Sequence, residues 1–279
     1  MSDANRSLVR LAPEFQGQEM ARVLRGLVGT PGPVGLNLLA LDRSGSMQPY
    51  IGAVEELLVQ IDQDMKGEVD AARRTLASVL SFSHEVRTEV PPTLLRNFVM
   101  PTEYRPDGST ALYAVTIKGI DICLGFLDGV TALYRETNPN GRLPEIRCAM
   151  TVLTDGGDTV LESRLRHEEL LARSEEAIKR GVTLTGIAVG IDPDHLQRLL
   201  GFKPGYVVHV PATAQGFRDA SDATSQTFTR SMTGLHVDPL RAPSPFTPVS
   251  TDGRTQLGEI VDDDQVPTGP GPFGPPRRR

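Results

Sequence analysis

Three side chains that carry oxygen stand at alternate positions directly after an apolar segment. The run Leu38–Leu41 has the length of a strand, and Asp42, Ser44 and Ser46 follow it, with Gly45 allowing a sharp turn. Parallel strands buried on both faces read as apolar runs, and ligands bind beyond their carboxyl ends. Oxygen donors without sulfur or imidazole suit magnesium, calcium or manganese. The alternative is a capped turn, in which Ser44 or Ser46 binds helix amides.

Two more oxygen donors occupy comparable places along the chain. Thr110 follows the turn Asp107-Gly108-Ser109 at the start of a long predicted helix, and Asp155 follows an apolar strand at 146–153. Because such loops meet at one edge of a parallel sheet, we expect both residues beside the first cluster. The combination favours a metal site over a capped turn. Its predicted ligand set is Asp42, Ser44, Ser46, Thr110 and Asp155, and its ion is predicted to be Mg²⁺, Ca²⁺ or Mn²⁺.

Strands and helices alternate through the middle of the chain. Apolar runs predict strands at 35–42, 76–82, 146–153, 182–191 and 206–210, and helical periodicity connects most of them. The short segment Val86–Val90 should be an antiparallel edge strand that ends at Pro91-Pro92. The pattern predicts an α/β fold, doubly wound and Rossmann-like, with a mostly parallel sheet, one antiparallel edge strand and helices on both faces.

Three regions differ in composition. Residues 1–33 read as an N-terminal helical arm and a Pro/Gly linker, which we expect to pack on the main domain; the alternative is an apolar face for a partner. Residues 34–234 carry the alternating pattern of the main domain. Residues 235–279 are rich in Pro and Gly, and we expect this tail to be largely disordered because it offers little apolar surface to bury.

Composition narrows the functional classes. With a net charge of -6 the chain lacks the basic footprint of a nucleic-acid-binding protein, and no apolar run approaches the length of a membrane span. The N-terminus lacks the apolar core of a secretory signal, and Cys123 and Cys148 stand among apolar neighbours as expected for free buried thiols. These features predict a cytoplasmic protein that contacts neither nucleic acid nor membrane.

The chain resembles a von Willebrand factor A (vWA) domain with a metal-ion-dependent adhesion site, of the bacterial cytoplasmic type. The D-x-S-x-S motif of that family appears as Asp42-Arg43-Ser44-Gly45-Ser46, its threonine loop as Gly108-Ser109-Thr110-Ala111-Leu112, and its second aspartate in Thr154-Asp155-Gly156. The resemblance covers roughly residues 34–232. Ser109 stands where many members carry a second glycine, a departure that affects no ligand.

The resemblance implies a role for each site residue. Ser44 and Ser46 would bind the ion directly, and Thr110 directly or through water. Asp42 and Asp155 would mostly hold ligating waters and the serine hydroxyls. An ion that faces neutral oxygens and keeps exchangeable waters is expected to be Mg²⁺, with Mn²⁺ or Ca²⁺ as alternatives. It would then accept one further anionic ligand, which in this family is typically an Asp or Glu of a partner protein.

We therefore expect a metal-dependent protein-binding module rather than an enzyme, similar to adaptors of stress, signalling or AAA+-associated systems. One alternative is a metal-dependent hydrolase, for which His84 would be the general base, since its turn should lie beside the first loop. Another is a structural subunit with an idle metal site. No phosphate-binding or nucleophile-elbow motif occurs in the sequence.

Overall fold

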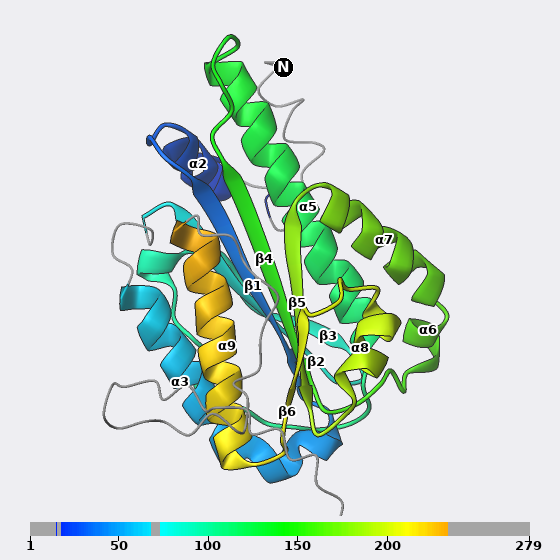
Figure 1. Ribbon diagram of the computed structural model, residues 1–279. Coiled ribbons are helices and arrows are strands. Elements are labelled where there is room, and N and C mark those ends of the chain that lie inside the picture. The colour runs from blue at the N-terminus through cyan, green and yellow to red at the C-terminus, as the bar shows by residue number, and fades with distance from the viewer. Residues whose placement is uncertain (1–14, 16–17, 68–72, 234–279) are drawn as a thin grey trace, which may run out of the picture. The chain divides into compact units, whose positions relative to one another are not determined.

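The computed structural model describes residue 15 and residues 18–67 and 73–233, with the side chains of residues 214 and 231–233 excepted (Figure 1). The predicted tail at 235–279 and most of residues 1–17 lie outside this part of the chain. All described residues belong to one compact unit, which spans residues 1–243.

A six-stranded sheet forms the centre of the unit, in the order β3-β2-β1-β4-β5-β6. Four neighbouring pairs run parallel, and only β3 runs antiparallel, to β2. The predicted fold class is confirmed, including the antiparallel edge strand. The strands are β1 (Val34–Asp42), β2 (Thr75–Phe82), β3 (Val86–Leu94), β4 (Ile146–Thr154), β5 (Val182–Val189) and β6 (Val207–Val210).

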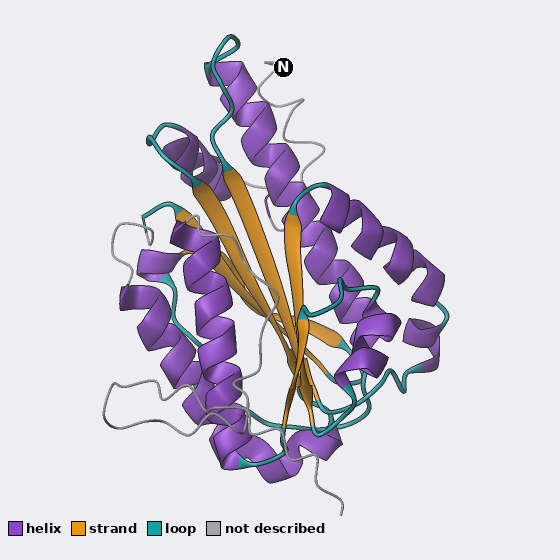
Figure 2. Ribbon diagram, viewed as in Figure 1, coloured by secondary structure: helices purple, strands orange, loops and turns teal. Residues whose placement is uncertain are grey.

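Helices cover both faces of the sheet (Figure 2). On one face α3 and α9 bury residues against Leu39 and Leu41 of β1. On the other face α2, α5, α7 and α8 pack against Leu36, Leu38 and Ala40 of the same strand. The helices are α2 (Gln18–Val28), α3 (Ile51–Gly67), α5 (Leu112–Thr137), α6 (Leu161–Arg164), α7 (His167–Lys179), α8 (Pro193–Leu200) and α9 (Ala214–Thr233), with 3-10 turns η2 (Gly45–Tyr50) and η3 (Leu95–Asn97).

The edge strand is longer than the sequence predicts. We expected it to end at Pro91-Pro92, yet β3 continues to Leu94, and Ala77 of β2 pairs with Thr93. The register shifts between Ala77 and Val79, which lets the strand continue past two residues that lack an amide donor. An edge strand tolerates proline because one side of its backbone has no strand to bond.

The described part of the N-terminal arm packs on the α/β core. Helix α2 buries Leu24 and Leu27, and the ring of Phe15 lies 5.8 Å from that of Phe126 in α5. An apolar stripe of this kind is stabilised by burial against a neighbouring element. The described residues of the arm therefore contribute to the same core as α5 and the sheet.

The central strands end together. Leu41 of β1 pairs with Leu153 of β4 in parallel register, so Asp42 and Thr154, the last residues of these strands, stand at the same edge of the sheet. Loops from three separated parts of the chain gather at this edge.

Candidate metal centre

Asp42 is the buried anchor of the site. It is 0% exposed, and both carboxylate oxygens are bonded: Oδ1 accepts from the Ser44 amide at 2.7 Å, and Oδ2 accepts from the Thr154 hydroxyl at 2.6 Å. The Tyr104 hydroxyl donates to the Asp42 carbonyl. Burial raises the pKa of Asp42 to about 6, against the bonds from Thr154 and Ser44, which lower it. Burial therefore destabilises the ionised carboxylate of Asp42, and a nearby cation would stabilise it.

The two serines connect the first loop to the third. Ser44 Oγ lies 3.0 Å from Ser46 Oγ, and Ser46 Oγ donates to Asp155 Oδ1 at 2.8 Å. Ser44 precedes η2 as its N-cap residue, but its side chain makes no capping bond to a helix amide. The capped-turn interpretation therefore fails for Ser44. The hydroxyls are instead aligned with each other and with a carboxylate.

Backbone bonds attach the threonine loop to the first loop. The Gly45 amide donates to the Gly108 carbonyl at 2.9 Å, and the Asp107 amide donates to the Arg43 carbonyl at 2.7 Å. Gly108 has φ +77°, a left-handed conformation that favours glycine. These contacts place the start of the Thr110 loop beside Gly45. Thr110 itself is buried, and its hydroxyl makes no hydrogen bond within the described residues.

Two residues of the loop after β4, Thr159 and Asp158, position Thr110 and the start of α5, and the sequence predicts no role for either. The Thr110 amide donates to Thr159 Oγ1 and the Thr159 amide donates to the Thr110 carbonyl, each at 2.8 Å. Asp158 Oδ2 accepts from the Tyr113 amide at 2.7 Å, at the first turn of α5, which has no capping side chain of its own. Asp158 follows Asp155 by three residues, but nothing in the sequence indicates that it caps a helix elsewhere in the chain.

Arg43, the charged residue inside the D-x-S-x-S motif, points away from the predicted ligands. Its Nη1 donates to Glu89 Oε1 at 2.6 Å, and Nε and Nη2 donate to the Arg105 carbonyl at 3.2 and 3.1 Å. Ser81 also donates to Glu89, at 2.5 Å. The guanidinium is therefore fixed on β3, where it neither occupies the site nor competes with a cation there.

His84 lies next to the threonine loop. A Cβ built on Gly108 would stand 3.0 Å from His84 Nδ1, so the imidazole and Gly108 are in close proximity. The ring is exposed and its Nδ1 lies 3.3 Å from Ser83 Oγ. The prediction that this turn lies near the first loop is confirmed, since Gly108 in turn bonds Gly45.

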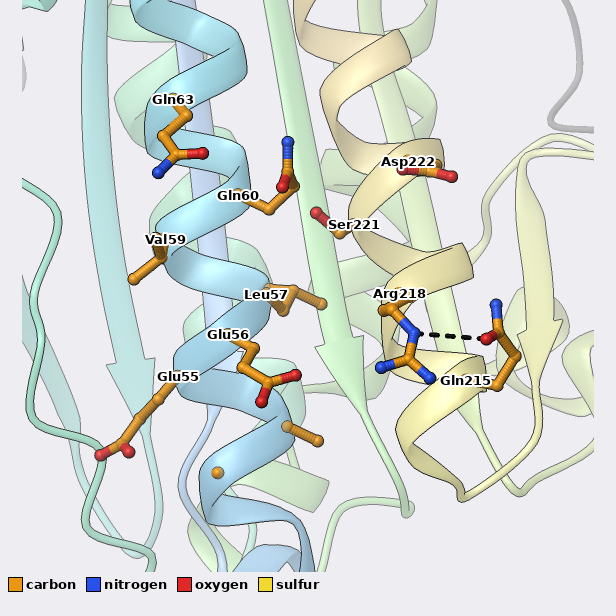
Figure 3. Close-up of a pocket in the computed structure, with 12 residues that line it drawn as sticks. Glu55, Glu56, Leu57, Val59, Gln60, Gln63, Gln215, Arg218, Ser221 and Asp222 are labelled. Carbon is orange, nitrogen blue, oxygen red and sulfur yellow. Dashed lines mark hydrogen bonds between the residues drawn. The ribbon is translucent and has the colours of Figure 1, made fainter.

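A groove of about 910 Å³ runs between α3 and α9 and contains none of the predicted ligands (Figure 3). Its walls carry carboxylates, amides and Arg218, whose Nε donates to Gln215 at 3.2 Å. Ser221 lines it with a buried hydroxyl that has no partner among the described residues. The predicted ligands at the sheet edge therefore lie outside this groove.

The donor set at the sheet edge fits a hard divalent cation. Ser44, Ser46 and Thr110 supply hydroxyls, and Asp155, a half-buried carboxylate whose pKa is raised by burial, supplies charge. Across residues 15, 18–67 and 73–233, no group of three or more His, Cys, Asp and Glu is placed to hold an ion. An ion at this edge would thus depend on hydroxyls and water as well as carboxylates, a ligand type that suits magnesium better than zinc.

Structural comparison supports the fold. The chain is similar to the pilus adhesin SpaC from Lactobacillus rhamnosus GG in its open conformation, with 13% identity, a TM-score of 0.51, and coverage of 73% of this chain and 31% of that one. It also matches proximal thread matrix protein 1 from the mussel byssus (14% identity, TM-score 0.46, 71% and 48% coverage). A third match is von Willebrand factor type A from Catenulispora acidiphila (14%, 0.40, 69% and 43%).

The likeness to SpaC concerns the fold alone, and nothing further follows from the two matches with lower TM-scores. The chain spans less than half the length of each of the three structures. No family model matches the chain, and no curated protein matches it. The vWA-like arrangement expected from the sequence, a mostly parallel sheet with one antiparallel edge strand, is confirmed. None of the helices in the described residues is both long and apolar enough to cross a membrane.

Proposed function

We propose that this chain is a metal-dependent protein-binding module of the vWA type and not an enzyme. A divalent cation, Mg²⁺ in our assignment, would be held by Ser44, Ser46 and Thr110 together with Asp42 and Asp155. A partner protein would bind by placing an Asp or Glu side chain on that ion. The module would serve as an adaptor in a multiprotein stress, signalling or AAA+-associated system.

One observation carries this proposal: oxygens from two loops 109 residues apart form a continuous chain, from Ser44 through Ser46 to Asp155. Ser46 is exposed, so this row of hydrogen-bonded oxygens reaches the protein surface. A bound cation would supply an open coordination position for an anionic ligand. The predicted ligand set contains two carboxylates, Asp42 and Asp155, and Asp42 uses both of its oxygens in internal bonds. A partner carboxylate would occupy a coordination position that the carboxylates of the site leave open.

The cytoplasm is our proposed location. Cys123 and Cys148 are both buried and free, as expected for thiols in a reducing compartment. We propose proteins as the partners, and neither nucleic acid nor membrane, because the net charge is -6.

A library of displayed peptides tests the proposal. Peptides retained in Mg²⁺ and released by chelator should share an Asp or Glu, and its replacement by Asn or Gln should abolish retention. Losing a charge-assisted contact costs about 1.5–3 kcal/mol, which is roughly ten- to hundredfold in affinity. Peptides retained equally in Mg²⁺ and chelator, or retained after the acid is neutralised, would contradict metal-mediated capture.

The proximity of His84 to Gly108 favours one second candidate, a metal-dependent hydrolase. In that case the imidazole would act as the general base toward a water at the ion. Purified protein should then turn over phosphoester or peptide substrates in Mg²⁺, and His84→Ala should abolish the turnover. On our proposal there is no such turnover, and His84→Ala leaves peptide capture intact. A site that binds Mg²⁺ but retains no peptide would instead support an idle structural site.

A further inference from the structure

Helix α6 presents two leucines to solvent directly after the Asp155 loop. Leu161 is 65% exposed and Leu165, which follows the helix as its C-cap, is 78% exposed. Residues four apart on a helix lie on the same side, so the two side chains form one apolar patch. Leu165 is the most exposed large apolar side chain in the described part of the chain.

Buried polar contacts fix this short helix in place. Four residues are too few to be helical without support. Asp158 supplies that support: Oδ1 accepts from the Val160 amide at 3.1 Å, and Oδ2 accepts from Ser163 Oγ. Ser163 is 3% exposed and its Oγ accepts from the Ala114 amide of α5 at 3.0 Å. The inward side of α6 is therefore anchored while its leucines face outward.

The patch adjoins the predicted ion site. The Val160 amide lies 3.3 Å from the Thr110 carbonyl, and Leu161 is the next residue. The Leu165 amide then donates to the Leu161 carbonyl at 3.1 Å. In Figure 1 α6 lies between α7 and the loops at the lower end of the sheet. A ligand bound at the Thr110 loop would thus lie beside the start of α6, which carries the leucines.

The two charged side chains of α6 cancel in net charge. Glu162 and Arg164 are both exposed and have opposite charges. The helix therefore adds apolar area next to the ion site without adding net charge. Displaying apolar side chains on a rigid element lowers the entropic cost of binding a partner to them.

We infer that Leu161 and Leu165 form the apolar half of the partner-binding surface, and that the partner carries a large apolar side chain within a few residues of its metal-binding Asp or Glu. This inference rests on the proposed function, and it adds a specificity that the ion alone cannot supply. Any accessible carboxylate can approach a cation, whereas the neighbouring leucines select a carboxylate that has an apolar neighbour.

The displayed peptide library, compared in Mg²⁺ and in chelator, also tests this inference. Peptides enriched by the full-length protein in Mg²⁺ should combine an acidic residue with Leu, Ile, Met or Phe within about four positions, one helical turn. The double variant Leu161→Ser/Leu165→Ser should bind these peptides at least tenfold more weakly. It should bind Mn²⁺ as the wild type does. Val99→Ser, at a valine that is 70% exposed and belongs to the loop after η3, is the matched control and should leave the affinities unchanged.

The outcomes separate the two proposals. Peptides that share an acid but no apolar neighbour, or that bind the double variant normally, would overturn the inference and leave metal-mediated capture standing. No enrichment in Mg²⁺ over chelator would contradict the proposed function itself. If the wild type self-associates in sedimentation and the double variant does not, with peptide affinity unaffected, the leucines contact a second copy of the chain and the inference is wrong.

Discussion

Ser46 Oγ donates a hydrogen bond to Asp155 Oδ1 at 2.8 Å, across 109 residues of sequence. The bond joins the loop after β1 to the loop after β4, and both loops stand at one edge of the sheet. Neither residue is needed there for packing, since Ser46 is exposed and Asp155 is half-buried. A hydroxyl and a carboxylate arranged in this way are suited to share a cation.

Asp42→Asn should remove a pH-dependent cost to stability. In the metal-free protein the pKa of Asp42 is raised by burial from 3.8 to about 6, so the folded state favours the protonated carboxyl. The cost of ionising it is absent below about pH 4, grows as the pH rises to about 6 and is constant above that, at about 3 kcal/mol. Urea unfolding in chelator from pH 4 to 7 should show the wild type losing about 3 kcal/mol of unfolding free energy relative to the variant.

The same variant should lose its response to the ion. At pH 7 Mn²⁺ should raise the melting temperature of the wild type and leave that of Asp42→Asn unchanged, because the neutral amide cannot balance the charge of a cation. Parallel pH profiles for the two proteins in chelator would contradict the assignment of the raised pKa to Asp42.

Thr159→Val should weaken metal binding without removing any predicted ligand. The substitution keeps the shape of the side chain but deletes the acceptor of the Thr110 amide, which lies 2.8 Å from Thr159 Oγ1. An unpaired amide costs about 1–3 kcal/mol, so we expect Mn²⁺ affinity to fall about tenfold. Thr159→Ser retains the hydroxyl and should restore the affinity.

Thr88→Val is the matched control for Thr159→Val. Thr88 lies on β3, and its hydroxyl accepts from Lys118 Nζ at 2.8 Å. Thr88→Val should leave the Mn²⁺ affinity unchanged. Equal affinities for Thr159→Val and the wild type would show that the threonine loop keeps its position without this contact.

Asp158→Ala should lower both stability and metal affinity. The carboxylate caps the first turn of α5 through the Tyr113 amide and also binds Ser163. Losing a cap costs about 0.5–2 kcal/mol of unfolding free energy. Asp192→Ala, which removes the N-cap bond to Asp194 at the start of α8, should cost a similar amount but leave Mn²⁺ binding unchanged. If both variants bind Mn²⁺ equally well, Asp158 is a cap and nothing more.

Sequence patterns predicted the elements and the grouping of the loops, because both follow from local chemistry. Apolar runs such as Leu38–Leu41 indicate buried strands, and residues that follow parallel strands must meet at one edge. The continuation of β3 past Pro91-Pro92 was not predicted, since it depends on a register shift against β2 that the strand's own residues do not encode.

The support of Thr110 could not be predicted either. Thr159 and Asp158 act on residues 49 and 45 positions away, so their partners are set by how the loop after β4 lies against α5. The pinning of Arg43 by Glu89 likewise depends on the position of the edge strand. Ligand types can be read from a motif, whereas the contacts that position them are a property of the packed fold.

A Mn²⁺ titration followed by electron paramagnetic resonance tests the central claim most directly. The wild type should bind a single weakly held Mn²⁺ per chain, in the micromolar to millimolar range expected where water completes the shell. Ser46→Ala and Asp155→Asn should each weaken binding at least tenfold. Ser83→Ala, at a hydroxyl that faces His84, should have no effect. Unchanged Mn²⁺ uptake in Ser46→Ala and Asp155→Asn, or no uptake by the wild type, would contradict the assignment of a metal site to these loops.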